Sequence, residues 1–192
     1  MEAYIIKGYR SAVGKAKKGG FKNFRSDDLA VAIIKQLMAA VPEVDPKQVD
    51  DVIVGCANPE GEQGLQVGRL IAARALGKEV PGITINRYCA SGLEAIGQAV
   101  AKIKAGYGHI YIAGGAESMS MIPMTGYKLA PSYQANMENL NYHVGMGATA
   151  EAVAAKYKIT REAADVFSYH SHKKAAEAID AGKFANQIVP VT

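Results

Sequence analysis

Residues 86–92 read Asn86-Arg87-Tyr88-Cys89-Ala90-Ser91-Gly92, and they join an expected strand to an expected helix. The run before them, 81–86, is β-like. The residues after them place apolar side chains at the spacing of one helix face, at Leu93, Ile96, Val100 and Ile103. Cys89 is therefore predicted to lie at a strand-to-helix turn, on or just before the first turn of the helix. We call residues 86–92 the cysteine elbow.

Two interpretations of Cys89 follow from this position. The partial positive charge at a helix N-terminus favours an anion, and the thiolate is the nucleophilic form of cysteine. The small neighbours Ala90, Ser91 and Gly92 would let a ligand come close to it. The alternative is a buried cysteine that only packs, because free cysteine is among the most buried residue types. The setting by itself leaves both open.

Strand-like and helix-like runs alternate on both sides of the cysteine elbow. The expected strands cover 3–8, 49–55, 81–86 and 109–113. The expected helices cover 29–41, 65–76 and the run from the elbow to residue 104. This order predicts an α/β fold, with a mostly parallel central sheet between layers of helices.

The pattern changes after Glu117. Residues 118–142 are rich in Met, Pro, Gly, Tyr and Asn and show no sustained periodicity, which is typical of a long functional loop or of contacts between subunits. Helices are expected over 148–157 and 161–181, and 187–192 looks like the start of a strand. We predict an α/β domain over 1–117 and a loop domain over 118–192, incomplete at its C-terminus.

Composition excludes several classes of protein. Of the 192 residues, 49% are hydrophobic and 21% are charged, which is ordinary for a soluble domain with a core. The net charge of +4 is mild and no basic stripe is interleaved with aromatics, so no nucleic-acid partner is expected. Neither a metal-ligand spacing nor a membrane-spanning stretch is present in the sequence. Without a signal-peptide pattern, a cytoplasmic location is expected.

Several motifs together resemble the N-terminal half of a thiolase, either an acetyl-CoA acetyltransferase or a 3-ketoacyl-CoA thiolase. The two specific ones are the cysteine elbow and Gly114-Gly115-Ala116-Glu117-Ser118-Met119-Ser120. The others are Arg10-Ser11-Ala12-Val13-Gly14-Lys15, Val52-Ile53-Val54-Gly55, Met146-Gly147-Ala148-Thr149-Ala150-Glu151 and Ile188-Val189-Pro190-Val191. The resemblance runs from the first strand to the last residue.

The resemblance implies a reaction on coenzyme A thioesters. Cys89 would attack a 3-ketoacyl-CoA and keep the acyl group as a thioester, and a second CoA would then remove it; the reverse reaction condenses acetyl-CoA. Its backbone N–H would help to hold the developing oxyanion. CoA and acyl-CoA would be substrates, with no cofactor and no metal. The family also needs a histidine and a second cysteine from C-terminal motifs that these 192 residues lack, so we expect little turnover from them alone.

The resemblance also implies partners. Thiolases are commonly dimers or tetramers, and a complete one is about twice this length, so a homodimer, a homotetramer or a C-terminal thiolase half is expected.

The resemblance also suggests a role for Met146, which would line the acyl pocket, with simple packing as the alternative. Short-chain biosynthetic thiolases carry histidine where this chain has Gly145, which favours a degradative or broad-range 3-ketoacyl-CoA thiolase, with fatty-acid β-oxidation as the expected role. The elbow would belong to half of a layered α-β-α-β-α sandwich.

The other candidate residues have plainer interpretations. Cys56 is expected to be a small core residue, and Glu117 a structural hydrogen-bonding carboxylate, with general base as its alternative. The histidines are expected to be structural or solvated: His109, His143, His170 and His172. Three other functions stay open, namely a half that only binds acyl-CoA or a partner, one half of a split thiolase, and a relative of the ketoacyl synthases.

Overall fold

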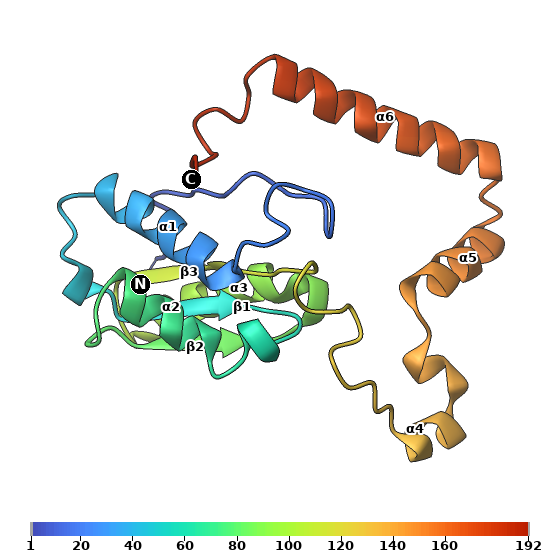
Figure 1. The fold of residues 1–192 in the computed structure, drawn as a ribbon, viewed down its shortest axis with the longest axis horizontal. Coiled ribbons are helices and arrows are strands. Elements are labelled where there is room, and N and C mark those ends of the chain that lie inside the picture. Colours follow the sequence, from blue (N-terminus) through green and yellow to red (C-terminus); the bar gives the residue numbers. More distant parts are fainter. Residues whose placement is uncertain (1, 192) are drawn as a thin grey trace. The chain divides into compact units, whose positions relative to one another are not determined.

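The computed structural model describes residues 2–191, which form two compact units (Figure 1). The first unit holds the described residues up to Lys128 together with those from Gln187 onward. The second unit is Leu129–Asn186. The boundary predicted after residue 117 stays a prediction.

The first unit is built on a parallel sheet of three strands in the order β2-β1-β3. These are β1 (Asp51–Gly55), β2 (Gly82–Ile85) and β3 (Tyr111–Gly115). Val52 pairs with Gly82 on one side and with Ile112 on the other, so β1 is the central strand. Its continuous apolar run, 52–54, is buried on both faces, as expected for a covered parallel strand.

Helices cover both faces of this sheet. Helices α1 (Ser26–Ala39) and α2 (Val67–Ala75) pack against Val52 and Val54. Helix α3 (Ser91–Ala105) packs against Ile53 on the opposite face. Because side chains alternate across a strand, the three consecutive residues of β1 serve two separate cores. The predicted α-β-α layering with a mostly parallel sheet is confirmed.

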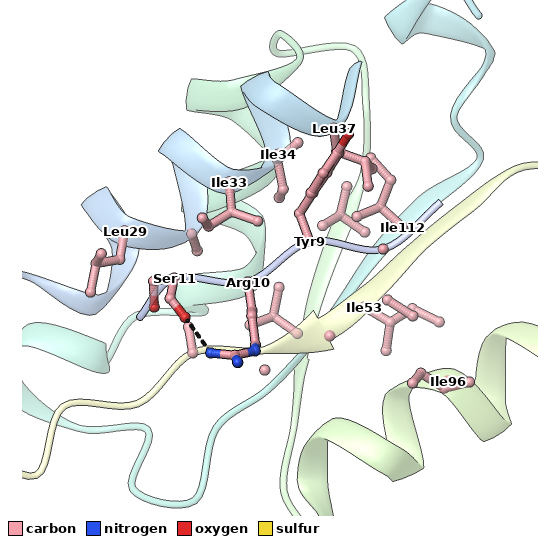
Figure 2. Close-up of a pocket in the computed structure, with 18 of the residues that line it drawn as sticks. Tyr9, Arg10, Ser11, Leu29, Ile33, Ile34, Leu37, Ile53, Ile96 and Ile112 are labelled. Atoms are coloured by element: carbon pink, nitrogen blue, oxygen red, sulfur yellow. Dashed lines mark hydrogen bonds between the residues drawn. The ribbon is translucent and has the colours of Figure 1, made fainter. Parts of the chain in front are cut away.

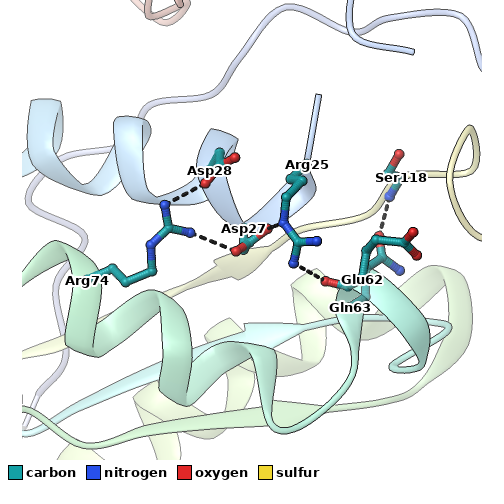
Figure 3. Close-up of polar contacts among 7 residues, drawn as sticks. All are labelled: Arg25, Asp27, Asp28, Glu62, Gln63, Arg74 and Ser118. Carbon is teal, nitrogen blue, oxygen red and sulfur yellow. Dashed lines mark hydrogen bonds and ion pairs between the residues drawn. The ribbon is translucent and has the colours of Figure 1, made fainter. Parts of the chain in front are cut away.

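A buried carboxylate joins α1 to its neighbours. The Asp27 side chain is 3% exposed and is held by Arg25 at 2.8 Å and by Arg74 of α2 at 2.7 Å. Arg25 also donates to the Glu62 carbonyl in the short 3-10 helix η2 (Gly61–Gln63) (Figure 3). A second short helix, η1 (Pro46–Gln48), precedes β1. This network fixes the loop after β1 against the start of α1.

The predicted first strand, 3–8, is wrong: this segment forms no strand in the described structure. Tyr4, Ile5 and Ile6 are 73%, 81% and 78% exposed. Strand-like pairing begins just after this segment, at Arg10. Arg10 makes an isolated parallel bridge to Ile188, which lies in the predicted C-terminal strand region. A strand requires a hydrogen-bonded neighbour, and a cavity separates this segment from β3.

That cavity has a volume of about 970 Å³ and a largely apolar lining. Figure 2 shows Leu29, Ile33 and Leu37 of α1 on one side of it, Ile96 of α3 on another, and Ile112 of β3 beside it. We call it the β3-edge cavity, because it runs along the edge of β3 that does not face β1. Residues 3–16 of the chain also line it.

The apolar face expected on α3 is also used differently. Ala95 and Ala99 pack onto the sheet, whereas Leu93 is 73% exposed. Ile96, Val100 and Ile103 line the β3-edge cavity. The periodicity predicted the helix correctly, but the small alanine face, which allows close approach to the strands, is the one that meets the sheet.

The second unit contains two short and two long helices (Figure 1). They are α4 (Tyr133–Glu138), the 3-10 helix η4 (Leu140–His143), α5 (Met146–Tyr157) and α6 (Arg161–Asp180). The Thr160 hydroxyl accepts the Ala163 N–H at 3.2 Å and caps α6, which confirms the predicted helix start. None of the helices among residues 2–191 is long and apolar enough to cross a membrane.

Candidate functional site

The cysteine elbow is a tight turn between β2 and α3. Cys89 is exposed and is the middle residue of the 3-10 helix η3 (Tyr88–Ala90), directly before α3. Tyr88 has a φ of 46°, in the left-handed region that a residue with a side chain rarely adopts. Such a conformation persists only where neighbouring groups hold it, and it is typical of turns that present a nucleophile.

Two polar side chains hold this conformation. The Asn86 Oδ1 accepts the Tyr88 N–H at 2.8 Å. The Ser91 hydroxyl accepts the Arg87 N–H at 2.8 Å and donates to the Tyr88 carbonyl at 2.6 Å. Ser91 is only 4% exposed, so these bonds are shielded from water. The backbone on both sides of Tyr88 is therefore fixed, and this fixes the orientation of the neighbouring Cys89.

The elbow lies directly against the end of β1. A Cβ at Gly55 would collide with the backbone of Ser91 and Gly92, so only glycine allows this approach. The Gly55 carbonyl also accepts the Ala116 N–H at 3.0 Å, which ties the end of β3 to the same place. The carboxyl ends of β1 and β3 and the first turn of α3 thus meet beside Cys89.

An ion pair lies at the start of α3, close to Cys89 in the sequence. Helix α3 is 15 residues long, and its N-terminal end follows Cys89 directly. Beside it, the Arg87 Nε donates to the Glu94 Oε2 at 2.8 Å. The Arg87 hydrogen bond, followed by one from Gln98, lowers the pKa of Glu94 below its ordinary value. Glu94 therefore stays a carboxylate, and much of its charge is balanced by Arg87.

Cys56 has the opposite environment. It is 1% exposed, in the turn that follows β1. Burial, followed by the charge of Glu117, raises its pKa to about 12. Its nearest polar partner is the Gln63 Nε2, at 3.4 Å from Sγ. A buried neutral thiol is inert, so the prediction that Cys56 is a core residue is confirmed.

This difference predicts selective alkylation. At pH 8, only about one in 10⁴ Cys56 side chains would be thiolate, given its pKa of about 12. We expect iodoacetamide to modify Cys89 in the folded chain and to leave Cys56 unmodified, up to pH 10. Peptide mapping by mass spectrometry measures both sites, and labelling in denaturant serves as the control in which both react. Equal labelling of the two cysteines in the folded chain would contradict the assignment.

Glu117 follows β3 and makes hydrogen bonds within the same region. Its Oε2 accepts the Ala57 N–H at 2.6 Å, and its Oε1 accepts from the Gln63 Nε2 at 2.5 Å. The structural interpretation of Glu117 is thus confirmed. The alternative, a general base, has no support in these contacts, because both carboxylate oxygens already accept protein N–H groups.

Met146 and three of the four histidines belong to the second unit. Met146 is the first residue of α5 in the second unit and is 72% exposed, so its role in an acyl pocket stays a prediction. His109 precedes β3, at the amino end of the sheet, where the Asp50 carboxylate accepts its backbone N–H. His143 contacts Asn136 at 2.8 Å. His170 and His172 are exposed on α6, as expected.

Sequence reasoning missed the hydrogen-bonding roles of Asn86 and Ser91, both in the elbow, and it did not single out Gln63. Their roles depend on backbone groups brought together by the fold, and the left-handed Tyr88 has no sequence signal. Among the residues that the structure describes, no group of three or more His, Cys, Asp or Glu side chains could hold a metal ion.

Comparison with known proteins gives a consistent result. Residues 3–192 match the family model described as thiolase, N-terminal domain. A 3-ketoacyl-CoA thiolase from Bacillus subtilis is 47% identical over 191 residues, which cover 99% of this chain and 49% of that protein. A 3-ketoacyl-CoA thiolase from Saccharophagus degradans is 41% identical over 189 residues, covering 98% and 48%. A 3-oxoadipyl-CoA/3-oxo-5,6-dehydrosuberyl-CoA thiolase from Escherichia coli is 39% identical over 207 residues, covering 99% and 51%. The chain spans about half the length of the curated relatives it matches.

Proposed function

The chain belongs to the thiolase family, and from this premise we propose that Cys89 carries the acyl group in thiolytic cleavage of a 3-ketoacyl-CoA. The observation that carries the proposal is the exposed Cys89 on a strained, hydrogen-bonded turn at the N-terminus of a 15-residue helix. A substrate can reach a thiol in that place, and cysteine is the nucleophile of covalent acyl transfer.

In the proposed step, the Cys89 thiolate attacks the 3-keto carbon of the substrate. The bond between C2 and C3 breaks, and the electron pair leaves on acetyl-CoA as its enolate, which takes up a proton. The acyl group remains on Cys89 as a thioester. The thiol of a second CoA then attacks this thioester, gives up its proton, and releases Cys89 with an acyl-CoA two carbons shorter.

The backbone near Cys89 suits the charge that develops in this step. The carbonyl oxygen becomes an oxyanion when the thiolate adds. The first-turn N–H groups of a helix such as α3 have no acceptor within the helix and can stabilise such a charge. We propose the Cys89 N–H as one donor. The protons of the thiols and of the enolate would be handled by a histidine and a second cysteine outside these 192 residues.

The remaining expectations are part of the same proposal. Acyl-CoA and CoA would be substrates and no cofactor would be needed, with Met146 contributing to the acyl pocket. The relatives named 3-ketoacyl-CoA thiolase support a role in β-oxidation. A cytoplasmic homodimer or homotetramer is the assembly that we propose.

The β3-edge cavity supports the proposal that further chain completes this fold. Its lining is apolar on several sides, and the β3 edge along it carries backbone groups that another strand could pair with. Together with the half-length match to the relatives, this favours a longer or split thiolase over a half that only binds acyl-CoA or a partner.

The test is the intact mass of the chain after incubation with acetyl-CoA. It would be measured on the chain alone and after co-expression with the half of the Bacillus subtilis relative that the chain does not match. We expect one acetyl group on Cys89 in the complemented protein and little turnover by the chain alone. An acetyl group that persists in the Cys89→Ser variant would overturn the proposal.

A further inference from the structure

We propose that Glu117 and Gln63 are positioning residues for Cys89, and that they act through the Ala57 peptide and the Asn86 side chain. Neither residue belongs to the cysteine elbow. The inference rests on the proposed function, because it assigns a purpose to the direction in which Cys89 points. The contacts that carry it form an unbroken series, from the end of β3 through the loop after β1 to the elbow.

The first step of the series fixes the loop after β1. Gln63 is completely buried, and its Oε1 accepts the Ser118 N–H (Figure 3). Its Nε2 donates to the Glu117 Oε1 at 2.5 Å and to the Asn58 carbonyl at 3.0 Å. The Glu117 Oε2 accepts the Ala57 N–H at 2.6 Å. A charged acceptor makes this bond stronger than a neutral one would.

The second step passes through a single peptide unit. While Glu117 holds the Ala57 N–H, the Ala57 carbonyl accepts from the Asn86 Nδ2 at 2.9 Å. Hydrogen bonds in a chain polarise one another, so each of these two bonds strengthens the other. The Ala57 carbonyl also selects the orientation of the Asn86 amide, because it can only accept and must face the NH₂ group.

The third step reaches the nucleophile. With its NH₂ group directed at Ala57, Asn86 must present Oδ1 to the Tyr88 N–H, at 2.8 Å. Tyr88 has the left-handed φ of 46° and is bonded directly to Cys89. A residue with a side chain stays in this conformation only when its surroundings over-determine it. Loss of the Glu117 contact therefore loosens the support of the strained residue next to Cys89.

The test compares variants of the chain by two measurements that do not need catalysis. These are hydrogen exchange of the Tyr88 amide and the rate of Cys89 alkylation by iodoacetamide. Glu117→Gln is nearly isosteric but replaces one acceptor oxygen by an NH₂ group that meets N–H donors. We expect it to speed Tyr88 exchange and to slow Cys89 alkylation, each by ~10-fold, the effect of weakening one hydrogen bond to a charged acceptor.

Two controls separate positioning from a loss of fold. Glu62→Gln changes a neighbouring carboxylate whose Oε2 accepts from the Tyr127 hydroxyl at 2.9 Å, so both rates should stay within ~2-fold of the parent. Exchange of the Val52, Ile53 and Val54 amides in β1 reports global opening. In Glu117→Gln, the exchange rates of these β1 amides should stay within ~2-fold of the parent. If the β1 amides speed up as much as the Tyr88 amide, Glu117 only stabilises the fold and the proposal fails.

The series also predicts that its members do not act independently. Asn86→Ala removes both bonds of the amide and should change the two rates at least as much as Glu117→Gln. In the Glu117→Gln, Asn86→Ala double variant, we expect no further change beyond Asn86→Ala alone. If the fold-changes of the two single variants multiply in the double variant, the residues act independently and the proposed series of contacts is wrong. If the complemented parent protein takes up no acetyl group, the proposed function fails. The exchange and alkylation rates still test whether Glu117 and Gln63 position Cys89.

Discussion

Replacement of Cys89 by alanine is expected to lower kcat/KM for thiolysis by about 10⁴-fold or more, because the variant has no atom to hold the acyl group. The measurement is made on the chain complemented with the unmatched half of the Bacillus subtilis relative, with a 3-ketoacyl-CoA as substrate. The elbow backbone should survive the change, since the bonds of Asn86 and Ser91 that fix it do not involve the Cys89 side chain.

The matched control is Cys56→Ala. Cys56 is the other cysteine of the chain, but it is buried, and its raised pKa of about 12 keeps it a thiol. We expect its removal to change kcat/KM by less than about 3-fold and to lower stability by ~1 kcal/mol, the cost of a small cavity. If Cys56→Ala stopped thiolysis and Cys89→Ala did not, the assignment of the nucleophile would be wrong.

The sequence was sufficient to predict much of the fold. Helix α3 and strand β1 follow from periodicity and from an unbroken apolar run, and their alternation predicts a parallel sheet with helices on both faces. The turn at Cys89 could be placed because a β-like run and a helical pattern meet there. These predictions depend on local patterns, which a chain carries whatever its partners are.

The errors occurred where the outcome depends on contacts between distant segments. Residues 3–8 are rich enough in apolar side chains to form a strand, but no strand lies beside them to complete the hydrogen bonds. On α3, the choice between the leucine–isoleucine face and the alanine face is decided by how closely β1 approaches. Neither can be derived from local periodicity.

The candidate site shows the same division. The turn position of Cys89 was predicted from its neighbours, whereas the hydrogen bonds that hold Tyr88 were not. Asn86 holds the Tyr88 N–H only because the loop after β1 presents the Ala57 carbonyl, and that loop is held by Gln63 and Glu117. The turn that carries the proposed nucleophile is thus encoded locally, and its orientation is encoded by the tertiary structure.

Gly55 gives the second large effect, because the elbow can reach β1 only where a side chain is absent. A Cβ at residue 55 would meet the Ser91 carbonyl and the Gly92 nitrogen, which are backbone atoms and cannot rotate away. We expect Gly55→Ala to lower the free energy of unfolding by ~3 kcal/mol, the cost of overpacking a core. Urea unfolding followed by circular dichroism measures this loss.

The same substitution should also displace Cys89, the proposed nucleophile. If α3 moves away from β1 to make room, Ser91 moves with it, and its hydroxyl can no longer hold the backbone on both sides of Tyr88. Cys89 alkylation should therefore change even at urea concentrations where the chain is still folded. Gly97→Ala is the control in the same helix. Its Cβ would meet no atom within 4 Å, and it should stabilise the helix by ~0.5–1 kcal/mol. Equal stability of the two variants would show that the approach of β1 to the elbow is not the reason for glycine at position 55.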